Sequence, residues 1–266
     1  MSETSAAEAL LRRDRVIVLG SLLAATALAW LWLVDMYMNM EMTGMGAAES
    51  GASMAALGID PAWTTAHFAA MFAMWAIMMV GMMLPGAAPM ILLFAAVNRK
   101  KREQGMTYVS TGAFAVGYLL AWTSFSLLAT TAQWGLHEAS LLSPMMASTS
   151  AVLGGLLFLA AGIYQWTPLK QVCLNHCRSP LAFILGHWRS GAKGALVMGL
   201  EHGAFCIGCC WFLMGLLFVL GVMNLLWVAV LTLLVLLEKM APFGIWQTRL
   251  SGAVLTALGA GLLFAG

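Results

Sequence analysis

The sequence predicts an all-α integral membrane protein, a bundle of about seven transmembrane helices with the N-terminus inside and the C-terminus outside. Of the 266 residues, 62% are hydrophobic and 9% are charged, whereas soluble domains are about half apolar and a quarter charged. Apolar runs recur along the chain, and Lys and Arg gather between alternate runs. No internal repeat divides residues 1–266, so we expect one membrane domain.

The predicted spans are the apolar runs that approach the roughly 20 helical residues needed to cross a bilayer. They lie at Val16–Val34, Ala66–Val97, Tyr108–Ala132, Met146–Tyr164, Ala195–Gly221, Leu225–Met240 and Gly244–Ala265. The first run is too long for a signal-peptide core and has no obvious cleavage site, so we expect it to be retained. Between the spans we expect an outer Met-rich acidic loop at 35–65 and an inner Cys/His-containing loop at 165–194.

Basic residues predict the orientation, because cytoplasmic loops collect Lys and Arg. They fall before the first span, after the second, between the fourth and fifth, and at the junction of the last two: Arg12, Arg13, Arg15, Arg99, Lys100, Lys101, Arg102, Lys170, Arg178, Arg189, Lys193, Lys239 and Arg249. The alternate loops carry only acidic charges. This pattern predicts a multi-pass protein of the bacterial inner membrane, surrounded by lipid, and no face for nucleic acid is visible.

Methionines crowd the predicted outer loop. Five fall within the ten residues after Asp35, a segment that also carries Glu41 but no Lys: Met36, Met38, Met40, Met42 and Met45. Thioethers are neutral, soft ligands that select Cu(I) over hard ions, so the segment is typical of a copper capture site. Methionine also fills irregular space between packed helices, and the sequence leaves both interpretations open here.

A stripe of soft ligands follows in the second span. His67, Met71, Met74, Met78 and Met82 are spaced by three and four residues, which keeps them along one side of a helix. Met79, Met83 and Met90 extend the set. The stripe would let Cu(I) pass by ligand exchange, or it is a Met-rich helix interface. Pro85 and Pro89 each remove a backbone donor, which favours a kink and leaves carbonyls that other groups must satisfy.

The fifth span carries the strongest ligand pattern. At 100° per residue, Met198, His202, Cys206 and Cys209 fall within about 80° of each other, and Cys210 lies just off that face. Three glycines, Gly199, Gly203 and Gly208, would let a neighbouring helix approach closely. Glu201 precedes the site, where it would orient His202 or balance the charge of a metal.

Two further cysteines, Cys173 and Cys177, lie in the predicted inner loop beside His176, and His187 follows. With Cys206 and Cys209 they would form one four-sulfur site or two two-coordinate sites, and the sequence leaves this open. Two thiolates suffice for linear Cu(I), whereas Zn prefers four ligands in a tetrahedron.

Two carboxylates lie within apolar runs, Glu201 and Glu238. Carboxylates in such positions often mark ion or proton paths. Glu238 adjoins Lys239, so an interfacial ion pair between these two residues is the alternative. We rank Glu201 above Glu238 as a residue supporting the metal ligands.

Several motifs together resemble a bacterial family described as predicted metal-binding integral membrane proteins, some of whose members are named copper chaperones. The motifs are Met74-Trp75, Met78-Met79, Met82-Met83-Leu-Pro85, Pro168-Leu169-Lys170 with Cys173 and Cys177-Arg178, Gly203-x-x-Cys206-x-Gly-Cys209-Cys210-Trp211, and Glu238-Lys239. The resemblance extends roughly from the second span to the sixth. It implies that the matching cysteines and methionines bind metal, and it leaves the metal, the direction of transfer and the partner open.

The leading hypothesis is a copper(I)-binding protein that captures the ion at the outer methionines, passes it along the stripe and holds it at Cys206 and Cys209. It would deliver copper to a copper-dependent membrane enzyme or across the membrane, with a soluble copper chaperone as a further candidate partner. No nucleotide-binding loop is present, and catalysis is not expected. The alternatives are a thiol–disulfide redox protein using the Cys206–Cys209 pair, a scaffold whose Cys and Met only pack, and Zn or haem in place of copper.

Overall fold

A computed structural model describes residues 15–39, 64–104, 111–139, 151–222, 224–240 and 245–265. Every regular element in these ranges is a helix, beginning with an N-terminal helix at Arg15–Asn39. The others are α2 (Thr65–Glu103), α3 (Thr111–Glu138), α4 (Ala151–Trp166), α5 (Pro168–Arg178), α6 (Pro180–His187), α7 (Gly191–Gly215), α8 (Leu217–Leu220), α9 (Leu225–Met240) and α10 (Ile245–Ala265). The prediction of an all-α protein is confirmed.

Four helical segments in the described ranges are long and apolar enough to cross a membrane: Arg15–Asn39, Thr65–Lys101, Thr111–Glu138 and Gly191–Leu220. The bent pair α4 and α5 would make a fifth. This is fewer than the seven spans that the sequence predicts. One reason is length, because α4 and α9 have 16 residues each, about 24 Å at 1.5 Å per residue, against a hydrocarbon core of about 30 Å.

The break between α4 and α5 has a local cause. Thr167 is extended, with φ −70° and ψ 145°, and its side chain caps α5 by accepting a hydrogen bond from the backbone N–H of Lys170 at 3.3 Å. Pro168 follows at the first turn, where a missing N–H costs nothing, and a residue before proline avoids helical geometry. The chain therefore bends by 66° here. Most of the segment expected as a loop at 165–194 is helical, in α5 and α6.

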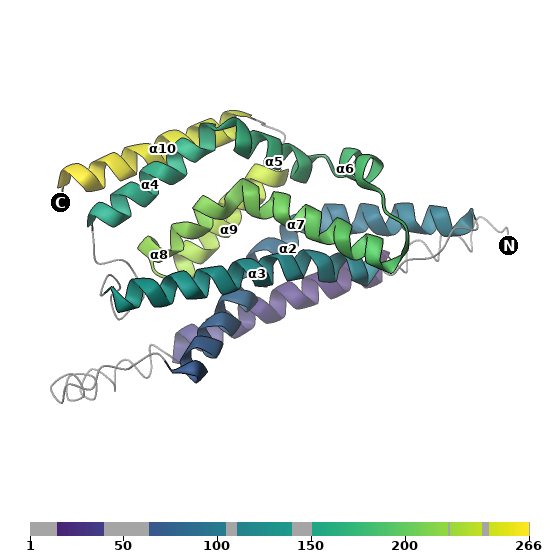
Figure 1. The fold of residues 1–266 in the computed structure, drawn as a ribbon, viewed down its shortest axis with the longest axis horizontal. Coiled ribbons are helices and arrows are strands. Elements are labelled where there is room, and N and C mark those ends of the chain that lie inside the picture. Colours follow the sequence, from purple (N-terminus) through teal and green to yellow (C-terminus); the bar gives the residue numbers. More distant parts are fainter. Residues whose placement is uncertain are drawn as a thin grey trace.

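Figure 1 shows the arrangement of the bundle. The helices α4 and α10 lie side by side along one edge, α7 and α9 occupy the middle, and α2, α3 and the purple N-terminal helix lie on the other side. The pairs α4 with α10, α3 with α7, and α2 with α3 make the most extensive helix–helix contacts. The two short helices α5 and α6 follow α4 and lead into α7.

Glycines set the close approach of α3 and α7. A Cβ added at Gly117 would collide with the carbonyl oxygen of Leu196, and one at Gly199 would collide with that of Phe114. At Gly203 an added Cβ would come within 2.5 Å of the Cβ of Ala121. Small residues at a crossing let two backbones pack at short range, which is the role that the sequence predicts for Gly199 and Gly203.

The helix α2 runs through both prolines, Pro85 and Pro89, as one element. Because Pro85 has no N–H, the carbonyl of Gly81, four residues earlier, lacks its intrahelical donor. The indole N–H of Trp30, from the N-terminal helix, donates to that carbonyl at 3.2 Å. A side chain from a neighbouring helix thus supplies the bond that the proline removes, as a low-dielectric interior requires.

The surface of the bundle is apolar. Large hydrophobic side chains are exposed on most helices, including Leu23 at 67%, Leu185 at 74% and Leu250 at 68%. Soluble proteins rarely expose apolar patches of such extent, whereas a lipid-facing surface consists of such side chains. The core, in contrast, holds methionines exposed by 2% or less: Met74, Met78, Met79, Met82, Met83, Met90, Met198 and Met214.

Candidate metal centre

The centre of the site is the thiol of Cys206, on α7, which is 2% exposed. The ammonium Nζ of Lys239, on α9, lies 2.9 Å from its Sγ. The hydroxyl of Tyr118, on α3, lies 3.2 Å from the same sulfur and also donates to the carbonyl of Met83, on α2, at 3.0 Å. Side chains from α3 and α9 therefore meet the sulfur of α7, and α2 is joined to them through the Tyr118 hydroxyl.

The Lys239 side chain links this thiol to the methionines of α2. Its Nζ also lies 3.9 Å from the thioether sulfur of Met83, and the residue is 8% exposed. A buried ammonium is costly unless an anion accompanies it. The nearest group able to supply that anion is the thiolate form of Cys206, a soft ligand for metal.

Three more thiols surround Cys206. The thiols of Cys209 and Cys210 donate to the carbonyl of Cys206 at 3.1 and 3.0 Å, and both are 1% exposed. The thiol of Cys177, on α5, is within hydrogen-bonding reach of Cys206 and Cys209. All five cysteines, these four and Cys173, are free thiols.

Cys173 takes a different position from Cys177, although both are on α5. Its Sγ packs against the backbone of α7 at Gly208, where an added Cβ would come within 2.8 Å of the sulfur. The third glycine singled out in the sequence thus makes room for a thiol. Of the two α5 cysteines, Cys177 is the one whose thiol reaches Cys206.

His202 lies beside the thiols in a cage of aromatic rings. It is 2% exposed, and its ring centroid is 6.1 Å from that of Phe114, 5.7 Å from that of Tyr118 and 5.5 Å from that of Phe183. Its Nδ1 atom is buried, and no hydrogen-bond partner for it exists among the described residues. A buried imidazole nitrogen without a partner can, when it is unprotonated, accept a hydrogen bond or bind a metal ion.

Three residues were expected to support the metal ligands, Glu201, Met198 and His176, and each has a partner of its own. Glu201 pairs with Arg189 at 2.5 Å, so its bound oxygen is directed to the start of α7 and not to His202. Met198 is fully buried, and its thioether accepts the backbone N–H of Arg189 at 3.3 Å. His176 stacks on Phe205, with ring centroids 4.1 Å apart.

The methionine stripe of α2 runs through the core. Met74, Met78 and Met82 are exposed by 1% or less, while Met71 is half-buried and its thioether accepts the amide of Gln133 at 3.9 Å. His67 is half-buried near the start of α2. The stripe extends along α2 toward Met83, at the cysteine centre.

The methionines expected at a capture loop lie at the end of the N-terminal helix and beyond it. Met36 is half-buried against the core and Met38 is 51% exposed. Met40, Met42 and Met45 lie outside the described residues. The capture loop therefore stays a prediction.

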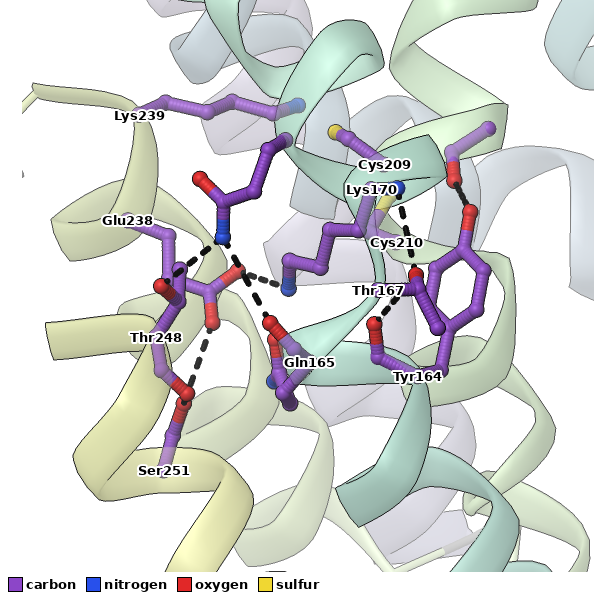
Figure 2. Close-up of polar contacts among 12 residues, drawn as sticks. Tyr164, Gln165, Thr167, Lys170, Cys209, Cys210, Glu238, Lys239, Thr248 and Ser251 are labelled. Carbon is purple, nitrogen blue, oxygen red and sulfur yellow. Dashed lines mark hydrogen bonds and ion pairs between the residues drawn. The ribbon is translucent and has the colours of Figure 1, made fainter. Parts of the chain in front are cut away.

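A separate buried ion pair adjoins the thiol centre. Lys170, on α5, and Glu238, on α9, pair at 2.7 Å with side chains 0% and 2% exposed, and Ser251 donates to the second carboxylate oxygen at 3.3 Å. Figure 2 shows Lys239 extending away from this carboxylate. The suggested Glu238–Lys239 pair is therefore wrong: Glu238 pairs with Lys170, and Lys239 turns to Cys206, because neighbouring residues on a helix point 100° apart.

The donor set suits a soft monovalent ion. Within the described ranges, no group of three or more His, Cys, Asp or Glu side chains is arranged to hold a metal, so a four-sulfur site is not preformed there. The site instead contains pairs of thiols, with the Met83 thioether and the Lys239 ammonium nearby. Two soft ligands are enough for Cu(I), and zinc would require more.

Sequence reasoning missed Lys239 and Tyr118 as parts of the site. The sequence did contain an indication for Lys239, since an ionisable residue near an apolar run is a candidate functional group. The sequence contained no such indication for Tyr118, because its position beside Cys206 depends on how α3 crosses α7. For Lys170 the sequence predicts only a basic residue of the inner loop, whereas the structure buries it against Glu238.

The described residues form a bundle in which four or five helical segments are long and apolar enough to cross a membrane, and its interior encloses thiols, thioethers and a buried ammonium; this combination is consistent with a metal-binding membrane protein. A family model, PpoB2, described as copper chaperone, matches residues 72–262. The chain belongs to this family, which confirms the resemblance drawn from its motifs. The match spans every residue of the cysteine centre. Neither the curated proteins nor the solved structures gave a match.

Proposed function

We propose that the protein is a membrane copper(I) chaperone that holds its cargo at Cys206 and Cys177, with Cys209, Cys210 and Met83 as neighbouring ligands. The observation that carries the proposal is the contact of 2.9 Å between the Lys239 ammonium and the Cys206 thiol inside the bundle. The family description, copper chaperone, supports copper as the cargo. Soft sulfur donors support the monovalent state.

Charge balance supports this choice of ion. Two thiolates and one Cu(I) carry a net charge of −1, which is costly to bury alone. The ammonium of Lys239 brings the total to zero. The nearby Lys170–Glu238 pair is neutral by itself and leaves this balance unchanged. Binding also releases the proton of each ligand that is still a thiol, so loading is coupled to deprotonation.

The methionine stripe supplies a route to the centre. Buried thioethers at Met74, Met78 and Met82 extend along α2 toward Met83, whose sulfur lies 3.9 Å from the Lys239 ammonium. Neutral thioethers bind Cu(I) more weakly than thiolates do, so an ion entering the stripe moves toward the cysteines. In this proposal the ion enters from the side of His67 and Met36, and the chaperone then passes it to a copper-dependent enzyme.

The membrane setting is part of the proposal. We place the protein in the bacterial inner membrane, with α9, α10 and the α4–α5 pair completing about seven spans and the N-terminus inside. The apolar exterior and the grouping of Lys and Arg between alternate runs support this placement.

The test is the copper content of protein purified anaerobically in detergent, measured by mass spectrometry. Cys177→Ser and Cys173→Ser form a matched pair, because both residues lie on α5 and only the Cys177 thiol reaches Cys206. We expect near-stoichiometric copper in the wild type and in Cys173→Ser, and strong loss in Cys177→Ser and Cys206→Ser.

Equal loss in both α5 variants would contradict the assigned ligands. A metal-free wild type in which Cys206 and Cys209 form a reversible disulfide would overturn the copper proposal and favour the thiol–disulfide redox protein. A thiol count on each sample distinguishes these outcomes.

A further inference from the structure

A hollow opens between α5 and α6, outside the cysteine centre. Two of its lining residues are histidines, His176 and His187, and their ring centroids lie 6.0 Å apart. The complete lining is Asn175, His176, Ser179, Ala182, Phe183 and His187, with a volume of about 220 Å³. It includes no carboxylate, so it offers little to hard cations such as Mg²⁺ and Ca²⁺.

Both imidazoles are held in one tautomer. The Nδ1 of His176 lies 2.8 Å from the carbonyl of Val172, and the Nδ1 of His187 lies 3.3 Å from the carbonyl of Phe183. A carbonyl only accepts, so each Nδ1 carries a proton, and in the neutral imidazole Nε2 then has the free lone pair. An imidazole whose N–H is fixed by a backbone carbonyl is the usual state of a metal-ligating histidine.

Both rings also make aromatic stacking contacts. His176 stacks on Phe205 with an interplanar angle of 4°, and His187 stacks on Phe183 with centroids 4.8 Å apart. Two nitrogens on one metal ion at about 2.0 Å each would be about 4 Å apart. Rings with centroids 6.0 Å apart can meet that spacing by small side-chain rotations.

The histidine pair is joined to the thiol centre by residues that neighbour the cysteines in sequence. His176 precedes Cys177, and Phe205, on which it stacks, precedes Cys206. The Cys177 thiol reaches Cys206 and Cys209, and Cys177 is half-buried, unlike the fully enclosed thiols of α7. Cys177 is therefore the thiol that links the helix carrying His176 to the buried centre.

We propose that His176 and His187 form a second copper site, at which Cu(I) is exchanged with the cysteine centre through Cys177. This proposal rests on the proposed function, because it assumes that the cysteine centre holds copper. Imidazole suits copper among the first-row metals and, being neutral, binds Cu(I) less tightly than a thiolate pair. A weaker site next to a tighter one is the arrangement needed for loading or release by ligand exchange.

The test is anaerobic titration of the full-length protein in detergent with Cu(I) against a chromophoric Cu(I) chelator, with copper X-ray absorption spectra at each equivalent. His176→Phe/His187→Phe keeps both stacking contacts and removes both nitrogens. His137→Phe, on α3, is the matched control. We expect the wild type and the control to bind two equivalents, the second adding nitrogen scattering, and the double variant to bind only one, with sulfur scattering.

Retention of the first equivalent shows that the double variant is folded and that the cysteine centre is intact. A double variant that still binds two equivalents with nitrogen scattering would overturn the histidine site. A wild type that binds a single equivalent, lost in Cys206→Ser, would overturn the histidine site and leave the proposed function standing. A wild type that binds no copper would overturn both.

Discussion

At the scale of single residues, Lys239 decides the character of the centre. Its ammonium is within 2.9 Å of the Cys206 sulfur and 3.9 Å of the Met83 sulfur. Helical periodicity placed Cys206, Cys209, His202 and Met198 on one face, and all four are buried. Periodicity within one helix says nothing of which side chain from another helix will meet that face, so it could not show Lys239.

Replacing Lys239 by Met should weaken Cu(I) binding at least tenfold, or about 1.4 kcal/mol. The physical reason is the loss of the positive charge that neutralises a bis-thiolate copper complex inside the bundle. Competition with a Cu(I) chelator measures the change. Lys100→Met, which removes an exposed charge at the end of α2, serves as the control. Equal affinities for Lys239→Met and the wild type would remove the charge-balance argument.

At the scale of helices, the buried pair Lys170–Glu238 joins α5 to α9. Pro168 and the Thr167 cap bend the chain so that α5 lies against α7 and α9. The sequence contained the local signals for this bend, Thr followed by Pro. It did not show that Glu238 would meet a lysine 68 positions away in place of its neighbour, because that depends on where the bend directs α5.

Breaking this pair from either side should destabilise the protein by about 3–5 kcal/mol, because each single replacement strands a buried charge. We expect Lys170→Met and Glu238→Met to lower the unfolding midpoint in detergent strongly, and the double variant to regain much of the loss. Arg189→Met is the comparison, since its pair with Glu201 is 54% and 27% exposed and should be worth at most about 1 kcal/mol. Additive losses in the double variant would show that the two side chains do not act as a pair.

At the scale of the whole molecule, the bundle differs from a soluble protein in its apolar exterior, and its largely hydrophobic interior also holds lysines, a carboxylate and thiols. Composition alone predicted the helical class, because a chain with 62% hydrophobic residues has few other ways to satisfy its backbone in lipid. The number of membrane spans is harder to predict from the sequence. Two apolar runs form helices of only 16 residues, and run length alone does not show how such helices lie in a bilayer.

The orientation can be tested with compartment-sensitive reporters fused after residue 104, after residue 190 and at the C-terminus. We expect the first two to report the cytoplasm and the third the opposite side, because Lys and Arg collect in the segments that remain inside. Wild-type copper content in each fusion would show that the fold is retained. Reports from residues 104 and 190 on different sides would contradict the assumed pairing of loops.

The hydrogen bond from Trp30 to the carbonyl of Gly81 has an evolutionary consequence. The matched family segment begins at residue 72, so Trp30 lies outside the part of the chain that defines the family. Pro85 lies inside it and removes the donor that Gly81 would otherwise use. A family member that keeps this proline therefore has a carbonyl in its second helix without an intrahelical hydrogen-bond donor. It must retain a donor at this level, on an N-terminal helix or on some substitute, or expose a bare carbonyl to hydrocarbon at a cost of several kcal/mol.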